Sequence, residues 1–375
     1  MKIKVKAGPH KRFFCPIEIE CREDLPSSFL LEDKDSGMLL PAQFEDSEEG
    51  RLITFVVPFL DKNEEKTYNL LEESLEDKVE LKMIEGSVEV YLRGNHFTSY
   101  HIDPSYPRPF LYPLYAPSQI PITRHFPMAE VEGESKDHKH HRSLWVAHGD
   151  VNGVDNWSEE EGHGRQVHRF FKEIKNGAVR GTLREVLDWV DSQGKKVLEE
   201  ERRIIFYNLL SPIRIMDFRI CFYASEGEVI FGDTKEGGII SLRVASDLEG
   251  KRGGVIENSF GAIGEREAWG KRAHWCDYWG HIKGEKLGVA ILDHPSNLRH
   301  PTYWHVRDYG LFTANPFGVS QFTSNPENRG DYKLPKGKRL VFSYRLLLHK
   351  GDTKEGRIRE HFLNYAYPPE VVMEK

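Results

Sequence analysis

The sequence predicts a mainly β protein: a small β-sandwich, then a large antiparallel β-sandwich, with one helix near the C-terminus. Three observations carry this prediction. Apolar and polar residues alternate along most of the chain, short polar turns separate the alternating runs, and a single segment has the spacing of an amphipathic helix. With 39% hydrophobic and 11% aromatic residues, the 375-residue chain can bury a sizeable core.

Residues 1–76 are expected to form the small β-sandwich domain. Their short alternating runs end in "ITFVVPFLDKNEEKTYNLLEE", and an acidic stretch with little strand character, residues 72–77, follows. A stretch of this kind between two alternating regions is typical of a boundary between folding units. The large sandwich is therefore expected to occupy residues 77–375.

Long hairpins predict the large sandwich. In "VELKMIEGSVEVYLRG", residues 79–94, the side chains of Val79, Leu81 and Met83 share one face, and a polar turn at residues 85–87 leads into a second alternating run. A longer hairpin follows over residues 178–207, with its turn at 192–194. Long antiparallel strands joined by short turns are the expected repeating unit.

Two segments depart from the strand pattern. Residues 103–127, "DPSYPRPFLYPLYAPSQIPITRHFP", contain prolines that remove donors from a β-ladder, so an ordered loop that crosses the large sheet is expected there rather than a central strand. Near the end of the chain, Asp352 and Glu355 have the spacing of a capping box, and Ile358 and Phe362 share one face before Pro368. A helix over about 353–365 is predicted.

Composition excludes several classes of function. The 59 acidic and 52 basic residues give a net charge of −7 with no basic stripe, so a nucleic-acid partner is not expected. No apolar run has the length of a membrane span or a signal peptide, so no membrane partner and a cytoplasmic location are expected. The four cysteines form no CxxC motif and are expected to be reduced thiols. Dinucleotide, P-loop, GxSxG and HExxH motifs are absent, so no organic cofactor is indicated.

Histidine clustering is the strongest chemical signal. Twelve of the 17 histidines fall in two windows of the sequence. The first window holds His125, His138, His140, His141, His148, His163 and His168, and the second holds His274, His281, His294, His300 and His305. Imidazole is the commonest metal ligand and titrates nearest neutrality, so such clusters favour a metal site or acid–base catalysis.

A metal site is predicted in the first window. On a strand through residues 142–148, His148 shares a face with residues just beyond the strand ends, so His140, His148 and Asp150 can converge if those ends bend. They are the predicted ligands of a divalent ion, with zinc as the expected one. His141 is expected to point away from His140. The alternative is that these imidazoles bind main-chain carbonyls inside a β-core.

A substrate-binding wall is predicted beside this metal site. Asn152, Asp155 and Trp157 belong to the turn "VNGVDNW", and Arg142 lies just before it. An aromatic ring beside amides and carboxylates suits a carbohydrate, because the ring covers C–H groups while the polar groups bind hydroxyls. Plain turn chemistry explains the same residues equally well.

Two later segments add candidate catalytic groups. In "GDTKEGGIISLRVA", Lys235 and Glu236 precede a glycine pair that opens a strand, which makes Glu236 a candidate general base and Lys235 a candidate substrate contact, unless this is only an exposed turn. In "HPTYWHVRDYG", Tyr303, His305 and Arg307 share one face of a strand. Three large polar side chains on one face favour a cleft wall. His305 is then a further ligand or proton donor, Arg307 holds an anionic or enolate oxygen, and Tyr303 binds substrate.

Several blocks in order resemble a bacterial family of unknown function that is often labelled PmoA or methane oxygenase. They are "PFLYPLYAP", "TRHFP", "HHRSLWVAHGDVNGVDNW", "DTKEGGIISLRVA" and "HPTYWHVRDYGLFTANPFG", and they span roughly Tyr106 to Phe317. The resemblance implies a β-supersandwich of the galactose-mutarotase-like type and a role in bacterial breakdown of sugars and cyclic polyols. In aldose epimerases of that fold a histidine acid and a glutamate base act across the concave face, and His305 or His148 with Glu236 are matching residue types here.

Three functions fit these features. The first is a metal-dependent hydrolase or lyase that opens the ring of a keto-sugar or diketone, acting on a carbohydrate or an oxidised cyclic polyol. The second is a metal-free mutarotase or epimerase, and the third is a non-enzymatic carbohydrate-binding protein. The enzyme hypotheses are favoured, because a binding module needs fewer titratable groups. The expected partner is a small carbohydrate or polyol, and an oligomer is compatible with the sequence but not indicated by it.

Overall fold

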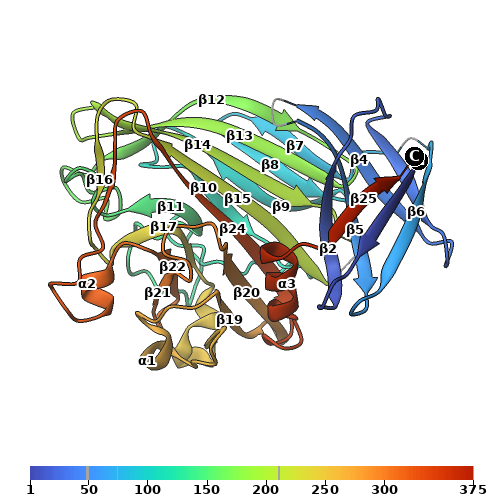
Figure 1. The fold of residues 1–375 in the computed structure, drawn as a ribbon. Helices are drawn as coiled ribbons and strands as arrows, with labels where there is room; N and C mark the ends of the chain where they lie inside the picture. Colours follow the sequence, from blue (N-terminus) through green and yellow to red (C-terminus); the bar gives the residue numbers. More distant parts are fainter. Residues whose placement is uncertain (48–49, 74, 210–211, 375) are drawn as a thin grey trace.

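The computed structural model describes residues 1–47, 50–73, 75–209 and 212–374, and it is mainly β (Figure 1). Most strands belong to three antiparallel sheets of seven, eight and eight strands, and a two-stranded sheet joins β16 (Val229–Phe231) to β23 (Tyr332–Leu334). The mainly β, antiparallel architecture predicted from alternation is confirmed.

The seven-stranded sheet contains the N-terminal segment. Its order is β2-β5-β4-β3-β6-β1-β25. The strands are β1 (Lys2–Lys6), β2 (Arg12–Glu20), β3 (Ser28–Asp33), β4 (Leu39–Ser47), β5 (Gly50–Leu60), β6 (Glu65–Leu71) and β25 (Glu370–Glu374). They enclose a core of their own that includes Ile3, Phe55 and Tyr68. The connection after β6 carries no strand in its described residues, in agreement with the acidic linker expected there.

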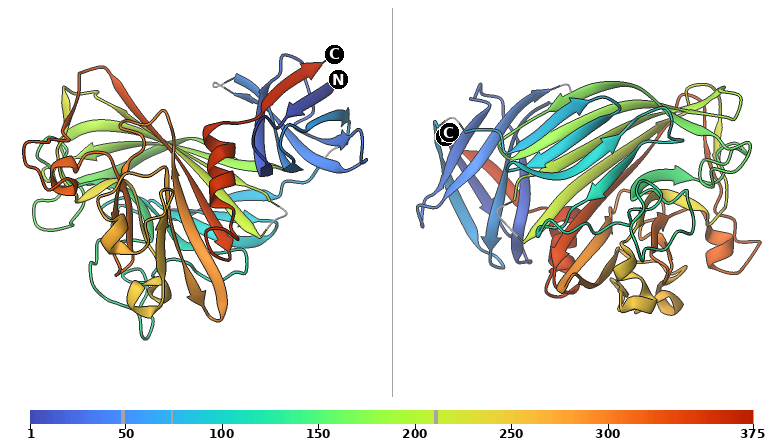
Figure 2. Two further views of the ribbon diagram at one scale, coloured as in Figure 1. Left: turned by 60° about the horizontal axis from the view of Figure 1, so that its bottom comes forward. Right: turned by 180° about the vertical axis from the view of Figure 1, so that it is seen from behind.

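The end of the chain returns to this first sheet. β25 pairs antiparallel with β1, with Lys2 opposite Glu374 and Val5 opposite Val371. Figure 2 shows β25 and the N-terminal strand side by side, at the far end of the molecule from the short helices α1 and α2. The small sheet is therefore built from both ends of the described chain, and the whole large sandwich lies between β6 and β25 in the sequence.

The two eight-stranded sheets form the large sandwich. The first has the order β21-β22-β17-β11-β10-β9-β8-β7. Its strands are β7 (Val79–Ile84), β8 (Ser87–Leu92), β9 (Asn95–His101), β10 (Phe110–Leu114), β11 (Leu144–His148), β17 (Gly237–Arg243), β21 (Tyr303–Val306) and β22 (Leu311–Asn315). The hairpin predicted over residues 79–92 is confirmed as β7 and β8.

The second large sheet has the order β12-β13-β14-β15-β24-β20-β19-β18. Its strands are β12 (Arg165–Lys175), β13 (Arg180–Val190), β14 (Lys196–Tyr207), β15 (Ile213–Tyr223), β18 (Val255–Asn258), β19 (Trp275–Ile282), β20 (Glu285–Asp293) and β24 (Arg339–Lys350). The long hairpin predicted around residues 192–194 is β13 and β14.

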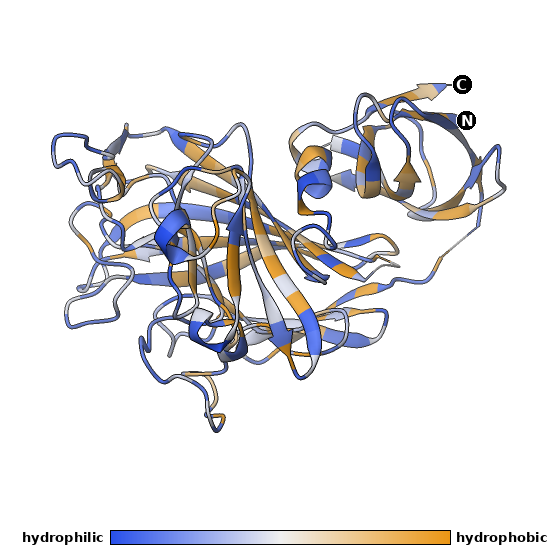
Figure 3. Ribbon diagram, turned by 90° about the horizontal axis from the view of Figure 1, so that it is seen from below, coloured by the Kyte–Doolittle hydropathy of each residue, from blue (hydrophilic) through white to orange (hydrophobic). Residues whose placement is uncertain are grey.

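The main core lies between these two sheets. Leu144 and Val146 of β11 belong to it, whereas Trp145 and Ala147 face outward and pack in a separate cluster. Hydrophobic and hydrophilic residues alternate along many strands (Figure 3), which is the pattern expected when each strand has one buried face. The outer face of the first sheet does not belong to this core, so its side chains are available for a functional site.

A buried ionic network crosses the main core. Tyr100 of β9 donates to Glu185 of β13 and accepts from Arg202 of β14 over 2.9 Å. The guanidinium of Arg202 also pairs with Glu200, which in turn accepts from the indole of Trp189 over 2.7 Å. Because each charge has a partner, the network joins the two sheets without leaving a charge unpaired.

The proline-rich segment was predicted wrongly in part. Residues 110–114 form β10, which lies inside the first sheet between β9 and β11. The ladder between β9 and β10 shifts register between Leu111 and Leu114, around Pro113. A proline is tolerated at such an irregularity because no ladder donor is required there, so the rest of the segment can still form a central strand.

The helix prediction needs two corrections. The C-terminal helix α3 is Ile358–Ala366, not 353–365. The main-chain N–H of Asp352 and that of Glu355 each donate to the carboxylate of the other residue over 2.9 Å, but these bonds close a turn, and Arg357 with φ 52° stands before the helix. Two four-residue helices were not predicted, α1 (Glu265–Ala268) and α2 (Val319–Phe322).

The remaining expectations concern thiols and membrane spans. All four cysteines are buried and free, as expected for reduced thiols. Among the described residues, no helix is both long and apolar enough to cross a membrane.

Candidate functional site

An open pocket of about 590 Å³ lies on the outer face of the first large sheet, over β11, β17, β21 and β22. It brings His138, His140 and His141 of the first histidine-rich window together with His305 of the second, whereas the other histidines of both windows lie outside its lining. Its lining residues are His138, His140, His141, Gly149, Asp155, Trp157, Ser158, Thr234, Lys235, Glu236, His305, Arg307, Tyr309 and Leu311.

Closely packed backbone at the start of β17 forms the floor of this pocket. Gly238 has φ 142°, and a Cβ built on it would lie 2.4 Å from the main-chain oxygen of Ala314 on β22. Gly149 donates its N–H to the oxygen of Glu236 over 3.0 Å. The side-chain amide of Asn315 donates to the oxygens at both ends of this segment, Thr234 and Gly237, over 2.9 Å each. The backbone that carries Lys235 and Glu236 is therefore tightly held.

His305 on β21 supplies the best-defined titratable group. Its Nδ1 lies 2.8 Å from the main-chain oxygen of Lys235. A carbonyl oxygen only accepts, so Nδ1 carries the ring proton and Nε2 keeps its lone pair. Nε2 has no hydrogen-bond partner among the residues that the structure describes. Burial lowers the pKa of His305 to about 4, so the ring is an uncharged base at neutral pH.

Charged groups surround this base. The ammonium of Lys235 pairs with the carboxylate of Glu236, and both side chains are more than a third exposed. The guanidinium of Arg307 lies 3.3 Å from the carboxylate of Glu265 and 5.6 Å from the ring centre of Tyr309. Burial raises the pKa of Tyr309 to about 12, so its hydroxyl stays protonated.

Three histidine rings form the opposite wall. His138 stacks on His141 with ring centres 4.8 Å apart and an interplanar angle of 6°, and His140 meets His141 edge-on at 4.4 Å. Neither ring nitrogen of His140 is hydrogen-bonded within the described chain, and burial lowers its pKa to about 4. His140 and His141 thus line one pocket, and the expectation that they point apart is wrong, because residues 139–143 form a turn and bend rather than a strand.

A buried arginine holds this wall in place. Arg243 of β17 donates to Nδ1 of His141 over 3.2 Å and to the carboxylate of Asp137 over 2.7 Å. An arginine only donates, so Nδ1 of His141 accepts and its Nε2 carries the proton. Although burial opposes it, hydrogen bonding from His138 and the charge of Arg243 keep the pKa of Asp137 far below its usual value. His141 is therefore a neutral N–H donor.

The turn with Trp157 closes the pocket on one side. Asp155 accepts from the main-chain N–H of Trp157 over 2.7 Å and of Ser158 over 3.0 Å. This arrangement orients Trp157, which packs on Trp145 at 5.5 Å and meets His140 at 5.5 Å. Asp155 thus supports the aromatic wall, in which Trp157 is 2% exposed and packed among other apolar side chains.

The structure brings seven of the predicted site residues to this pocket. They are His140, Asp155, Trp157, Lys235, Glu236, His305 and Arg307. Three predicted substrate contacts lie outside its lining. Arg142 pairs with Glu159 over 2.8 Å, Asn152 donates to the oxygen of Glu228 over 3.2 Å, and Tyr303 stacks on Phe322 at 5.6 Å.

The predicted ligand set His140, His148 and Asp150 does not assemble. His148 is fully buried, and its Nε2 lies 2.9 Å from the oxygen of Gly232, beside the ring of Phe317. It faces the core, whereas His140 faces the pocket on the other side of the sheet. Asp150 accepts from the N–H of Gly153 over 2.9 Å. The strand ends do not bend enough to reverse the side-chain alternation.

The pocket donors can still be tested against a metal ion. His140, Nε2 of His305 and Glu236 have the right chemistry for zinc. Among the described residues, however, no group of three or more histidine, cysteine, aspartate or glutamate side chains is placed to hold an ion. The donor types fit zinc, while their arrangement in this structure is not a formed metal centre.

Some pocket residues were missed from the sequence. His138, His141, Ser158, Thr234 and Tyr309 were not chosen as site residues, and they line the pocket. Tyr309 sits in the tight "RDYG" turn after β21, where Gly310 has φ 99°. A tyrosine at the end of a strand that carries His305 and Arg307 was the available signal.

Comparisons with known proteins give one family and several distant structures. The profile of a family described as "Family of unknown function (DUF6807)" matches residues 87–363. That description does not carry the methane-oxygenase label. Among curated proteins, no relative matches the sequence.

Three of the similar solved structures are an aldose epimerase homologue, a galactose 1-epimerase and a galactose mutarotase related enzyme. The GalM/aldose epimerase homologue from C. elegans is 8% identical with a TM-score of 0.33, covering 73% of this chain and 99% of that chain. Galactose 1-epimerase from Lactobacillus acidophilus NCFM is 6% identical with a TM-score of 0.30, covering 90% and 99%. A galactose mutarotase related enzyme from Lactobacillus acidophilus is 11% identical with a TM-score of 0.25, covering 72% and 97%.

Proposed function

Because the chain belongs to the DUF6807 family, whose function is unknown, we propose a function from its own pocket: a hydrolase that opens the ring of a small polyhydroxylated carbonyl compound, a keto-sugar or an oxidised cyclic polyol. The observation that carries the proposal is the state of His305. Its proton is held at Nδ1 by the oxygen of Lys235, so Nε2 is a bare, uncharged base in a pocket that also holds two cations.

The surroundings of His305 suit a hydroxyl-rich substrate with a polarised carbonyl. Lys235 and Arg307 supply positive charge for an oxygen that becomes anionic. The partly exposed rings of His140 and Tyr309 can meet the C–H face and the hydroxyls of a ring. A volume of about 590 Å³ accommodates a sugar-sized ring with water.

The proposed reaction is hydrolytic cleavage of a bond between a carbonyl carbon and its activated neighbour. Nε2 of His305 takes a proton from water, and the oxygen of that water bonds to the carbonyl carbon. The carbonyl electrons move to oxygen, beside Arg307 and Lys235. When the C=O re-forms, the adjacent C–C bond breaks and its electron pair goes to the enolate of the second carbonyl. The imidazolium gives its proton to the α-carbon of that enolate, so one water is consumed and one carboxylic acid is formed, which ionises to a carboxylate by releasing a proton to solvent.

Glu236 is the second candidate for the base. It lines the same pocket, but its carboxylate is paired with Lys235. In the proposed arrangement this pair positions the ammonium. Substitution separates the two roles: Glu236→Gln should then lower kcat about tenfold, whereas His305→Gln should lower it by about 10²–10⁴. A larger loss in Glu236→Gln than in His305→Gln assigns the base to Glu236.

Isotope labelling tests the reaction itself. The protein is incubated with cyclic diketones and keto-polyols in H₂¹⁸O, and the products are analysed by NMR and mass spectrometry. Hydrolysis places one ¹⁸O in a new carboxylate. An epimerase or mutarotase gives an isomer of unchanged mass formula, and a binding protein gives no product but saturable binding. His281→Asn, on an exposed position of β19, is the control and should retain full activity.

A divalent ion, zinc first, remains part of the proposal. Its donors would be His140 and Glu236, because the Nε2 lone pair of His305 serves as the base, and a bound ion would polarise the carbonyl and lower the pKa of a water molecule. No step above depends on it. Elemental analysis of the purified protein tests this point: bound zinc that falls in His140→Ala supports the metal-dependent form, and full activity after exhaustive chelation contradicts it.

A further inference from the structure

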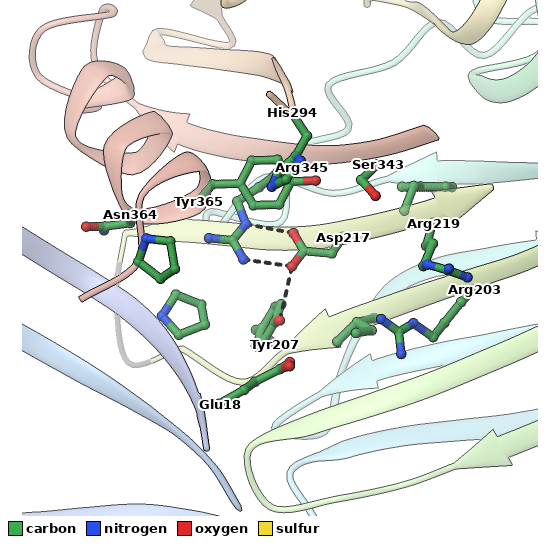
Figure 4. Close-up of a pocket in the computed structure, with 14 residues that line it drawn as sticks. Glu18, Arg203, Tyr207, Asp217, Arg219, His294, Ser343, Arg345, Asn364 and Tyr365 are labelled. Carbon is green, nitrogen blue, oxygen red and sulfur yellow. Dashed lines mark hydrogen bonds and ion pairs between the residues drawn. The ribbon is translucent and has the colours of Figure 1, made fainter. Parts of the chain in front are cut away.

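A second pocket lies on the opposite side of the molecule, on the outer face of the second large sheet. It has a volume of about 280 Å³ and lies where β14, β15 and β24 meet β2 of the small sheet and the end of α3 (Figure 4). Its lining includes Glu18, Arg203, Tyr207, Asp217, Arg219 and Arg345. The candidate active site shares none of these residues.

The floor of this pocket is already neutral. Arg345 makes a bidentate pair with Asp217, with both N–O distances 2.7 Å, and Tyr207 donates to the same carboxylate over 3.0 Å. Figure 4 shows these side chains beneath the ring of Tyr365, over which the guanidinium of Arg345 lies at 4.6 Å. The other carboxylate at the pocket, that of Glu18, is paired with Arg180.

The strand register places arginines in a row beside that floor. Arg184 of β13 is opposite Arg203 of β14, and Arg203 is opposite Arg219 of β15. Like charges directly opposite each other on adjacent strands repel. Arg184 is compensated by Glu201 at 3.0 Å. Arg219 has no hydrogen bond or ion pair with any residue that the structure describes.

Arg219 therefore carries the uncompensated charge at the pocket. Figure 4 shows Arg203 and Arg219 close together at the side of the pocket away from α3. The hydroxyl-bearing Ser343 is the residue opposite Arg219 on β24, so a donor lies on the next strand. A guanidinium binds a carboxylate or phosphate group through two parallel N–H donors.

We propose that this pocket binds a small organic anion, a carboxylate or phosphate on a compact hydroxylated skeleton, through Arg219 with Arg203 and Ser343. The volume of 280 Å³ lies just below the range of drug-sized ligand sites, which limits the ligand to a small metabolite. Such a ligand would contact the small sheet, α3 and the second large sheet together. The proposal is independent of the reaction assigned to the first pocket.

Calorimetric titration of the full-length protein tests the site. Sodium phosphate and sodium gluconate are titrated separately, at constant ionic strength set with chloride so that general screening does not differ between samples. At least one of the two should bind with a stoichiometry of one. Arg219→Gln should weaken that binding about tenfold or more, and Arg219→Lys should weaken it less, because it keeps the charge without the fork geometry.

Two control variants decide the location. Arg266→Gln removes an arginine whose side chain is 92% exposed, and it should leave binding unchanged. Arg307→Gln alters the candidate active site and should also leave it unchanged. Binding that falls in Arg307→Gln but not in Arg219→Gln assigns the anion to the first pocket and overturns the proposal. Absence of binding by both anions overturns it as well.

Discussion

Nδ1 of His305 lies 2.8 Å from the main-chain oxygen of Lys235, which ties the ring on β21 to the backbone at the entrance of β17. The same short segment carries Lys235 and Glu236, so one local backbone conformation sets the tautomer of the base and the position of two charged neighbours. Side-chain chemistry at this pocket therefore depends on the glycine and asparagine contacts that hold that segment.

The pH dependence of activity should reflect His305. Burial lowers its pKa to about 4, so the neutral form that accepts a proton is fully populated above about pH 5. We expect kcat/KM to be level from neutral pH down to that value and then to fall as the ring is protonated. Glu236 acts to raise this pKa, so Glu236→Gln should move the fall to lower pH. Circular dichroism at each pH separates loss of activity from unfolding, and a midpoint near pH 6.5 contradicts the assignment.

Arg243 should matter for both stability and activity. Its side chain is fully buried, and it contacts Asp137 and Glu249 as well as Nδ1 of His141. Arg243→Met leaves two carboxylates without this partner, and removal of one member of a buried ionic group costs about 3–5 kcal/mol. Urea denaturation should show a loss of that order. Arg266→Met, at an exposed position, should change the free energy of unfolding by less than about 0.5 kcal/mol.

Gly238 should not tolerate a side chain. Its φ of 142° disfavours other residues, and a Cβ would lie 2.4 Å from the backbone of Ala314. Gly238→Ala should lower the free energy of unfolding by about 3 kcal/mol and separate β17 from β22. Gly227→Ala is the matched control, because nothing lies within 4 Å of its Cβ position. Equal stability of the two variants contradicts this account.

Arg202 should be essential to the main core. It is almost fully buried and pairs with Glu200 and Tyr100 between the two large sheets. Arg202→Met leaves a buried carboxylate without its counter-charge, at a cost of about 3–5 kcal/mol. The double variant Arg202→Met with Glu200→Gln should recover part of that loss, because it removes the unpaired charge. A double variant less stable than the single one argues against charge compensation as the cause.

Most of the fold could be predicted because the alternation of apolar and polar residues along a strand indicates that one of its faces is buried. Both long hairpins and the strands that carry Gly237 and Tyr303 were found in this way. β10 was not, because its prolines suggested a loop, and only tertiary pairing shows that Pro113 falls at a shift in register. The start of α3 was also missed, because a capping pattern does not reveal that Arg357 takes a left-handed conformation.

The predictions for the candidate site also succeeded or failed according to whether tertiary contacts set the direction of the side chain. His305 was placed correctly because it lies within a strand, where side-chain direction follows from period two. His140 and His141 lie in a turn, where direction depends on partners such as Arg243, more than a hundred residues away in the sequence. His148 does lie in a strand, but which of its two faces met the core was not decided by the sequence pattern. A period-two pattern gives relative directions, and the absolute direction requires the packing of the sandwich.

The pairing of β25 with β1 has a consequence for cooperativity. Residues 370–374 complete the small sheet and follow directly from α3, which packs on the second large sheet through Ile358 and Phe362. Detachment of β25 alone would leave β1 as an open edge able to pair with another chain. Because α3 links β25 to the second large sheet, the small sheet and the sandwich are coupled through this strand, and loss of the strand alone is expected to promote self-association while the large sandwich is still folded.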